Sequence, residues 1–177
     1  MRCPSRSGSA GGMTARSPGV AGDEERIVEI TLDEHTVLRR AVEIEHERAA
    51  AISDLLRENR FAPVSGRRGP FRVHLAIAEN RLNLEIGSLA DGTRETITLP
   101  LAPFRGIVKD YFMVCESYYA AAKKAGLAQI EALDAGRRSL HDEGSALLRE
   151  RLADRVAIDH DTARRLFTLI CVLHLKG

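Results

Sequence analysis

The segment GRRSLHDEG, from Gly136 to Gly144, brings together residue types that are well suited to hold an anion. Arg137 and His141 are four residues apart, which places them on one face of a helix. Arginine offers a planar set of permanently charged donors, and histidine adds a donor that titrates near neutral pH. We expect this pair, with the adjacent Arg138, to form an anion-binding site if a pocket lies beside it.

Further polar groups for this site could come from the helical segment that precedes Arg137 and His141. The candidates there are Asp110, Glu116 and Tyr118. The alternative is structural: an ion pair ties the two helical segments together, and Asp134 then joins the acidic partners open to Arg137 or Arg138. We favour the structural interpretation, because ion networks that only stabilise a fold commonly resemble sites. The functional interpretation predicts a concave pocket beside Arg137 and His141.

The loop VSGRRGPFR carries a second chemical signal, the adjacent residues Arg67 and Arg68. Adjacent arginines on a loop that contains glycine can contact phosphates. Phe61 and Phe71 flank the loop, and interleaved arginine and aromatic residues are typical of proteins that bind nucleic acid. No signature of a known nucleic-acid-binding module accompanies them, and the formal net charge is only +1. We therefore favour a solvated loop over contact with nucleic acid.

The stretch EIEHE, from Glu43 to Glu47, could contribute His46 to a metal site. Its partners would be His141, Asp142 or His174. Each of these ligands would have to come from another helix, and no HExxH or CxxC motif fixes two ligands locally. We expect His46 to be a core histidine, and we predict no metal and no cofactor. No GxSxG, GxGxxG or phosphate-loop motif occurs, so no motif identifies the chain as an enzyme.

The periodicity of the sequence predicts the strands that support these residues. Apolar and polar residues alternate in 27–32, 71–78, 82–86 and 97–99. With turns at Glu79-Asn80 and Asp91-Gly92, the last three segments predict an antiparallel three-stranded meander, apolar on one face and polar on the other. On the polar face His74 should lie opposite Glu85, with Thr98 as the next neighbour. Segment 27–32 could extend the sheet to four strands, with Val28, Ile30 and Leu32 on one face.

Helices are predicted at 42–59, 104–122, 127–152 and in the C-terminal segment. In the first helix the apolar stripe is Val42, His46, Ala49, Ile52 and Leu56, which leaves Glu47 to solvent. In the third helix, Gly136 and Gly144 indicate either a break or a close backbone contact, because glycine weakens a helix interior.

The C-terminal helix should begin at an N-cap, either Asp159 or Asp161. From Leu166 to Leu175 it is apolar nearly all round, so we expect it to lie buried at the centre of the domain, against the sheet. Strands followed by helices indicate an α+β fold, with about four helices packed on one face of the sheet.

Composition sets the domain organisation that we expect. Hydrophobic residues make up 44% of the 177 residues and charged residues 29%, which is typical of a folded protein. Residues 1–22 are mostly small, polar or basic and predict a disordered tail, whereas 23–177 form a single domain. No apolar run is long enough to cross a membrane. Cys3, Cys115 and Cys171 form no CxxC motif and indicate a reducing, cytoplasmic location.

Several long phrases of the sequence resemble one known family. They are RIVEITLDE, VEIEHERAAAISDLLREN, LPLAPFRGIVKDYFMVCESYY, QIEALDAGRRSLHDEGSALLRERL and DHDTARRLFTLICVLHLKG. Together they resemble the bacterial uncharacterised protein family 0262, over the range from Arg26 to Gly177. The resemblance implies a stand-alone bacterial protein. It implies no activity, because the family has none assigned, and no catalytic residue can be transferred from it.

The leading hypothesis is a non-enzymatic protein that binds an unknown protein or a small anionic ligand through its helical side. Adjacent arginines would recognise the negative charge, at Arg39-Arg40, Arg137-Arg138 and Arg164-Arg165. The rival is a small enzyme or anion-binding protein centred on Arg137 and His141. A third possibility is nucleic-acid contact through Arg67 and Arg68. Nothing in the sequence sets the oligomeric state.

Overall fold

A four-stranded sheet, a small two-stranded sheet and four helices make up the computed structural model, which describes residues 23–33, 42–124 and 126–174. The main sheet has the order β1 (Ile27–Leu32), β3 (Phe71–Ala78), β4 (Arg81–Ser88) and β5 (Arg94–Pro100), and the small sheet pairs β2 (Phe61–Pro63) with β6 (Val156–Ile158). The helices are α1 (Val42–Arg57), α2 (Arg105–Lys124), α3 (Leu127–Leu152) and α4 (His160–His174), with short 3-10 turns at Asp23–Glu25 and Ala102–Phe104. The predicted tail at 1–22 lies outside the described residues, as do Cys3, Arg39-Arg40 and Leu175.

The antiparallel meander of β3, β4 and β5 is confirmed. Glu79 and Asn80 form the first turn with φ values of 53° and 60°, the left-handed conformation that a two-residue hairpin requires. His74 lies opposite Glu85 as predicted. The next neighbour of Glu85 is Thr96 rather than Thr98, because β5 is shifted by two residues relative to our count.

The fourth strand, β1, pairs parallel to β3, so the sheet is mixed rather than wholly antiparallel. The prediction that Val28 shares the inward face with Ile30 is wrong. A register irregularity between Ile27 and Glu29 breaks the alternation, so Ile27 is buried while the Val28 side chain is 40% exposed. The Asn59 amide holds this strand to the end of α1, since it accepts from the Ile27 amide at 2.8 Å and donates to its carbonyl at 2.9 Å.

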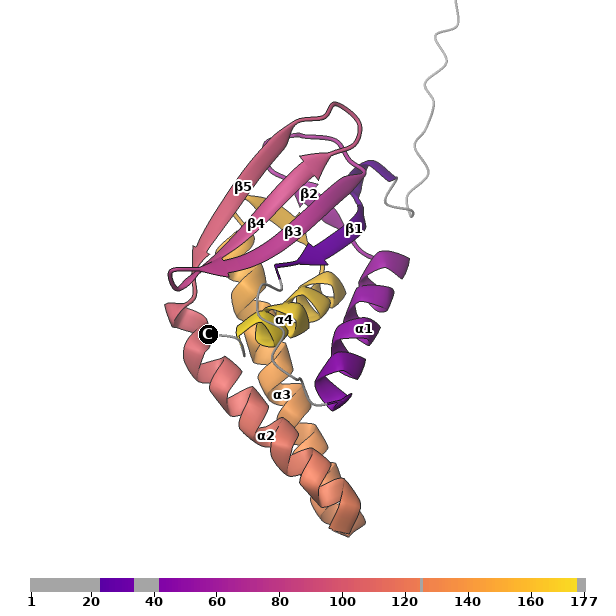
Figure 1. Ribbon diagram of the computed structural model, residues 1–177, viewed down its shortest axis with the longest axis vertical. Helices are drawn as coiled ribbons and strands as arrows, with labels where there is room; N and C mark the ends of the chain where they lie inside the picture. The colour runs from indigo at the N-terminus through magenta and orange to yellow at the C-terminus, as the bar shows by residue number, and fades with distance from the viewer. Residues whose placement is uncertain (1–22, 34–41, 125, 175–177) are drawn as a thin grey trace, which may run out of the picture.

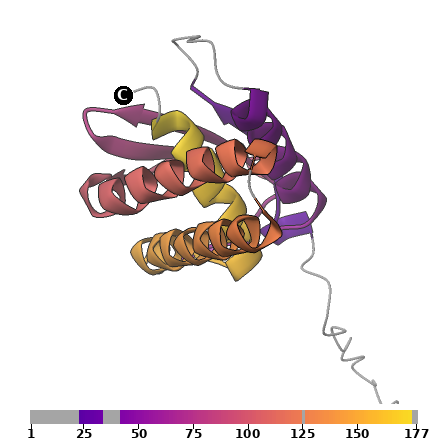
Figure 2. The same ribbon diagram turned by 90° about the horizontal axis from the view of Figure 1, so that it is seen from below.

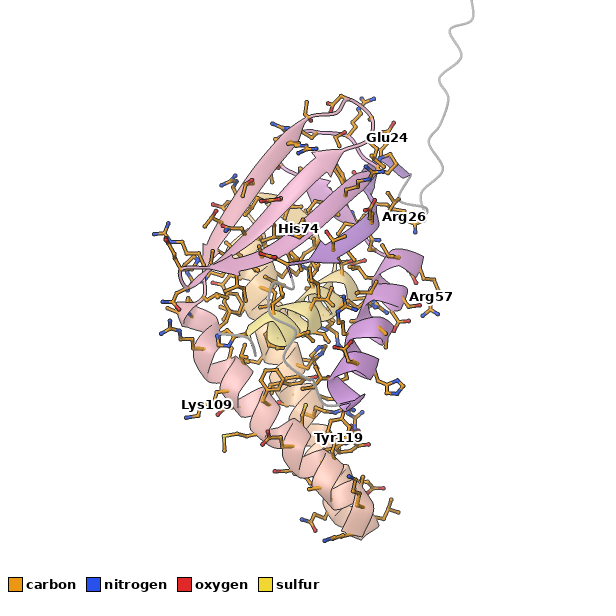
Figure 3. The ribbon with its side chains drawn as sticks, viewed as in Figure 1. Glu24, Arg26, Arg57, His74, Lys109 and Tyr119 are labelled. Atoms are coloured by element: carbon orange, nitrogen blue, oxygen red, sulfur yellow. The ribbon has the colours of Figure 1, made fainter. Side chains whose placement is uncertain are left out.

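The predicted central position of α4 is confirmed. Every residue from Leu166 to Leu173 is buried. In Figures 1 and 2 the helix lies beneath the sheet, with α1 on one side and the α2–α3 pair on the other. Asp159 is its N-cap, because the carboxylate accepts from the Thr162 amide at 2.8 Å. The helices therefore cover the apolar face of the sheet, and none of the helices that the structure describes covers the opposite face, which carries His74 (Figure 3).

Helix α3 runs unbroken through both of its interior glycines. Gly144 is the close contact that the sequence left open as an alternative, because a Cβ atom there would overlap the Phe167 ring of α4. At Gly136 a Cβ atom would make only an ordinary contact with Val114, at 3.8 Å. Gly144 thus lets α3 approach α4 closely enough to form one wall of a pocket.

The predicted stripe of α1 is partly right, since Ile52 and Leu56 pack against the core, but its centre is displaced by about one residue, or roughly 100° of rotation. Ala51 and Leu55 are buried, whereas His46 and Ala49 are exposed. Consequently His46 is not a core histidine, and Glu47, which we expected in solvent, is partly buried. The spacing of apolar residues predicted the wrong centre for the buried face because the inward face of α1 carries polar residues as well as apolar ones.

Two further predictions concern the thiols and the membrane. Cys115 and Cys171 are both buried and unpaired, as expected for small core groups. None of the helices within the described ranges is long and apolar enough to span a membrane.

Candidate functional site

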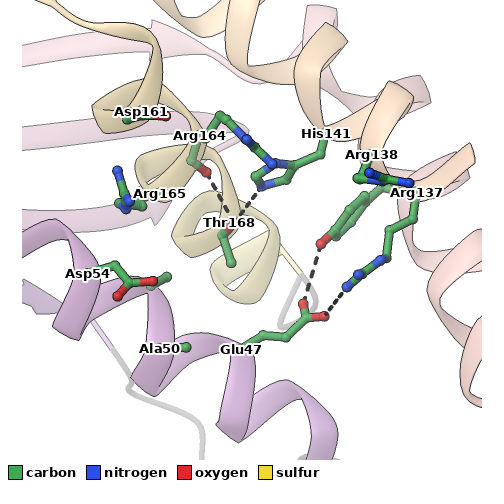
Figure 4. A pocket seen from close by; sticks show the side chains of 12 residues that line it. Glu47, Ala50, Asp54, Arg137, Arg138, His141, Asp161, Arg164, Arg165 and Thr168 are labelled. Atoms are coloured by element: carbon green, nitrogen blue, oxygen red, sulfur yellow. Dashed lines mark hydrogen bonds and ion pairs between the residues drawn. The ribbon is translucent and has the colours of Figure 1, made fainter. Parts of the chain in front are cut away.

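A pocket of about 310 Å³ lies beside Arg137 and His141, between α1, α3 and α4. Its cationic lining consists of Arg137 and Arg138 from α3 and of Arg164 and Arg165 from α4. Its acidic lining consists of Glu47, Asp54 and Asp161. Figure 4 shows these side chains arranged around one opening, with α1 below and α4 and α3 above it. Two arginine pairs that are distant in the sequence therefore meet in one place.

Arg137 ties α3 to α1. Its guanidinium lies 2.8 Å from the Asp134 carboxylate and 3.5 Å from that of Glu47. It also stacks over the Tyr118 ring, 4.9 Å from the centroid, which is a cation–π distance. The Asp134 pair lies within α3, so the ion pair that ties two helices is the one with Glu47, and it joins α3 to α1 rather than to the preceding helix α2 as we expected. The pocket that the functional interpretation requires is present as well.

Glu47 is the residue that sequence reasoning missed. Its carboxylate accepts from the Tyr119 hydroxyl at 2.7 Å, from the Tyr111 hydroxyl at 3.4 Å and from Arg137 at 3.5 Å. Burial and the nearby Glu47 carboxylate raise the pKa of both tyrosines, so their hydroxyls stay protonated and donate. These partners lie 64 to 90 residues away along the chain, so no local pattern could have identified them.

His141 lines the pocket, but both of its ring nitrogens are occupied by α4. Arg164 Nε donates to His141 Nδ1 at 3.3 Å, so the proton of the neutral ring lies on Nε2, which is 2.7 Å from the Thr168 hydroxyl. Thr168 in turn donates to the Arg164 carbonyl at 3.1 Å. Burial and the adjacent Arg164 lower the pKa of His141 to about 4, so the ring is neutral at neutral pH. It fixes Arg164 in place and carries no positive charge for an anion.

The remaining arginines differ in how much of their charge is compensated. Arg138 is largely exposed and lies 3.2 Å from Asp134, and Arg164 lies 3.6 Å from Asp142 through its Nε. Arg165 is half-buried, and no ion pair or hydrogen bond joins its side chain to any other residue that the structure describes. Arg165 is therefore the guanidinium of the pocket whose charge has no partner among the described residues.

Asp110 and Glu116 are both exposed on α2 and do not line the pocket. Of the groups proposed to assist from α2, only Tyr118 contacts Arg137. The acidic groups at the pocket come from α1 and α4 instead.

The loop with Arg67 and Arg68 is engaged within the protein. Arg67 Nε lies 3.1 Å from the Glu95 carboxylate, and Arg68 is 4.0 Å from that of Glu24, which Figure 3 labels. Phe61 and Phe71 are fully buried and pack edge to face with their centroids 5.5 Å apart. Neither ring is accessible for stacking on a base.

His46 is exposed on α1, whereas His141 is hydrogen-bonded to Thr168 of α4. Within the part of the chain that the structure describes, no group of three or more His, Cys, Asp or Glu residues could hold a metal ion.

Comparison with known proteins gives the chain its relatives. The model of an uncharacterised protein family, UPF0262, matches residues 24–176. The chain belongs to this family. A UPF0262 protein of Rhodospirillum rubrum is 56% identical over 159 residues, which cover 90% of this chain and 98% of the relative. UPF0262 proteins of Paramagnetospirillum magneticum and Nitrobacter winogradskyi are each 52% identical, over 86% and 93% of this chain and 98% and 99% of the relatives.

No solved structure matches this UPF0262 chain. The resemblance that we found in the sequence is confirmed by the family match. UPF0262 is described as uncharacterised, so the roles of the pocket residues have to be argued from their geometry.

Proposed function

We propose that this UPF0262 protein is a cytoplasmic bacterial binding protein that holds a small anionic ligand in the pocket between α1, α3 and α4, without catalysing a reaction. One observation carries the proposal. Arg165 is a half-buried residue that brings a permanently charged guanidinium to the pocket, and among the described residues it has no carboxylate partner. A guanidinium that is partly removed from water is best stabilised by an anion with matching geometry. A bound ligand would supply that anion.

The neighbouring Arg164 supports the same interpretation. Its Nε is engaged with His141 and Asp142, which fixes the direction of the side chain. Its two terminal nitrogens have no hydrogen bond among the described residues, so they remain as a pre-oriented fork for a carboxylate or a phosphate. A donor that is already ordered loses little entropy when the ligand binds.

The state of the other polar groups favours binding over catalysis. A general base needs an accessible nitrogen or oxygen within reach of the proton that it removes. The His141 nitrogens are both engaged, and the Glu47 carboxylate already accepts from two tyrosines and one arginine. These groups therefore support the walls of the pocket.

Two observations support the remaining parts of the proposal. The buried, unpaired thiols of Cys115 and Cys171 are typical of a reducing compartment, which favours the cytoplasm. Among the described residues, the large apolar side chains that are exposed come from separate segments: Val28, Val64, Leu89, Met113 and Leu127. Single exposed apolar residues are ordinary on a protein surface, so a small ligand is favoured over a protein partner.

The proposal is tested by calorimetric titration of the purified chain with phosphate, citrate and short dicarboxylates, and by thermal shift with the same anions. We expect at least one anion to bind and to raise the melting temperature. Arg165→Ala should weaken that binding by about tenfold or more, as expected for the loss of a hydrogen bond to a charged group. Arg149→Ala, an exposed arginine of α3 outside the pocket, is the matched control and should bind normally. Equal affinity in wild type and Arg165→Ala would overturn the proposal.

A further inference from the structure

The pocket is lined by negatively charged as well as positively charged side chains. Besides its arginines it is lined by Glu47, Asp54 and Asp161. A site shaped only for an anion would keep carboxylates away, because like charges at close range in a partly desolvated space repel one another. The three carboxylates in the lining therefore need an explanation other than the binding of an anion.

The three carboxylates differ in how many acceptor positions remain open. Glu47 is satisfied, since one of its oxygens accepts from Tyr119 and Arg137 and the other from Tyr111. Asp54 uses one oxygen, which accepts from Arg57 at 2.7 Å, and its second oxygen has no hydrogen bond among the described residues. Asp161 has neither a hydrogen bond nor an ion pair among those residues. The open acceptors of the pocket are thus on Asp54 and Asp161.

These open acceptors line the same pocket as Arg165. Asp161 and Arg165 are four residues apart on α4, so they project from the same face of the helix. In Figure 4, Arg165 lies between Asp161 above it and Asp54 below it. Arg165 forms an ion pair with neither. One pocket therefore presents a cation without an ion-pair partner together with two carboxylates that have free oxygens.

We propose that the ligand is amphoteric: it carries an ammonium group for Asp54 and Asp161 next to an anionic group for Arg165. This inference rests on the proposed function and narrows its ligand class. The pocket volume of about 310 Å³ lies at the small end of the range for small-molecule sites. An amino acid, or an amine of similar size that bears a phosphate, has the required size and pair of charges.

Matched probes that differ only in the ammonium group test the inference. We would titrate the full chain with glutamate and glutarate, and with phosphoethanolamine and ethyl phosphate. The member that bears the ammonium group should bind about tenfold more tightly in at least one pair. Asp54→Asn and Asp161→Asn should each reduce that preference, and the double variant should abolish it while leaving the affinity for glutarate or ethyl phosphate unchanged or higher.

The outcomes separate this inference from the proposed function. If glutarate or ethyl phosphate binds as tightly as its amino counterpart, and Arg165→Ala weakens it, the amphoteric ligand is refuted and the anion pocket stands. If neither member of either pair binds, the amphoteric ligand is refuted, and the anion pocket is then decided by the titrations with phosphate and citrate. If Arg165→Ala binds both members like wild type, both proposals are overturned. Glu143→Gln, an exposed carboxylate of α3 outside the pocket, is the matched control for the charge change. Far-ultraviolet circular dichroism would verify that each variant is folded.

Discussion

The Tyr119 hydroxyl donates to the Glu47 carboxylate at 2.7 Å, and this one contact joins α2 to α1 across 72 residues of the chain. Because Arg137 of α3 reaches the same carboxylate at 3.5 Å, three helices meet at Glu47. The pocket keeps its shape through a side chain that looks, in the sequence, like an ordinary solvent-facing glutamate.

Glu47→Ala should destabilise the protein by about 2–3 kcal/mol, because it leaves a tyrosine hydroxyl and a guanidinium without their shared acceptor. Tyr119→Phe should cost about 1 kcal/mol. Urea denaturation of both single variants and of the double variant forms a cycle, in which we expect the two effects to be non-additive because the groups share one hydrogen bond. Strict additivity would show that the contact contributes nothing to stability.

His141 should make the protein less stable as the pH falls from about 6.5 towards 4. Burial and Arg164 hold its pKa at about 4 in the folded chain, so between these values the unfolded state binds the proton and the folded state does not. The stability that this residue contributes should therefore fall by on the order of 1–2 kcal/mol between pH 7 and pH 5.

His141→Gln serves as the reference for this measurement, because the amide keeps a donor for Thr168 and does not titrate. The difference in unfolding free energy between wild type and His141→Gln should shrink as the pH falls. His174, whose pKa is also lowered by burial, contributes equally to both proteins and cancels. A difference that is independent of pH would contradict the neutral, buried state of His141.

Gly144→Ala should destabilise the protein by about 1–3 kcal/mol, although alanine is the better helix former, because the new methyl group overlaps the Phe167 ring. Gly136→Ala in the same helix meets only Val114 at 3.8 Å and should stabilise by about 0.5–1 kcal/mol. Thermal denaturation of the two variants gives a direct comparison. If both alanines were tolerated equally, the close approach of α3 to α4 would be wrong.

Arg165→Ala should leave the ligand-free protein as stable as wild type or stabilise it by up to about 1 kcal/mol, because the removed charge has no partner among the described residues. Arg137→Ala should instead destabilise it by about 2 kcal/mol, since it breaks two ion pairs. Chemical denaturation without added anions distinguishes the two arginines. A large loss in Arg165→Ala would mean that this residue supports the fold and is not held ready for a ligand.

The elements that could be predicted are those whose signals are local. The meander follows from alternating residues and from turns such as Glu79-Asn80, and the burial of α4 follows from its apolar surface. The bulge at Val28 and the parallel pairing of β1 with β3 could not be predicted, because both depend on a partner strand about 44 residues away, as the pair Ile27 and Phe71 illustrates.

The same limit applies to the candidate site. Arg137, Arg138 and His141 were found because they lie within five residues of one helix, a spacing that is readable in the sequence. Glu47 could not be found, since the face of α1 that it shares with Ala51 is decided by how α1 packs on α4. Helix packing decides which carboxylates lie beside an arginine, so they cannot be predicted from the sequence. Arginines that are close together in one helix can be recognised from their spacing.

The burial of α4 also has a consequence for biosynthesis. Helices α1, α2 and α3 and the four-stranded sheet are all translated before α4, the segment that fills the space between them. Until α4 has been synthesised, the apolar faces of those earlier elements lack the helix against which they pack. During that time they are prone to incorrect association. Completion of the fold, and with it of the pocket whose wall includes Arg164 and Arg165, is therefore deferred until α4 has emerged.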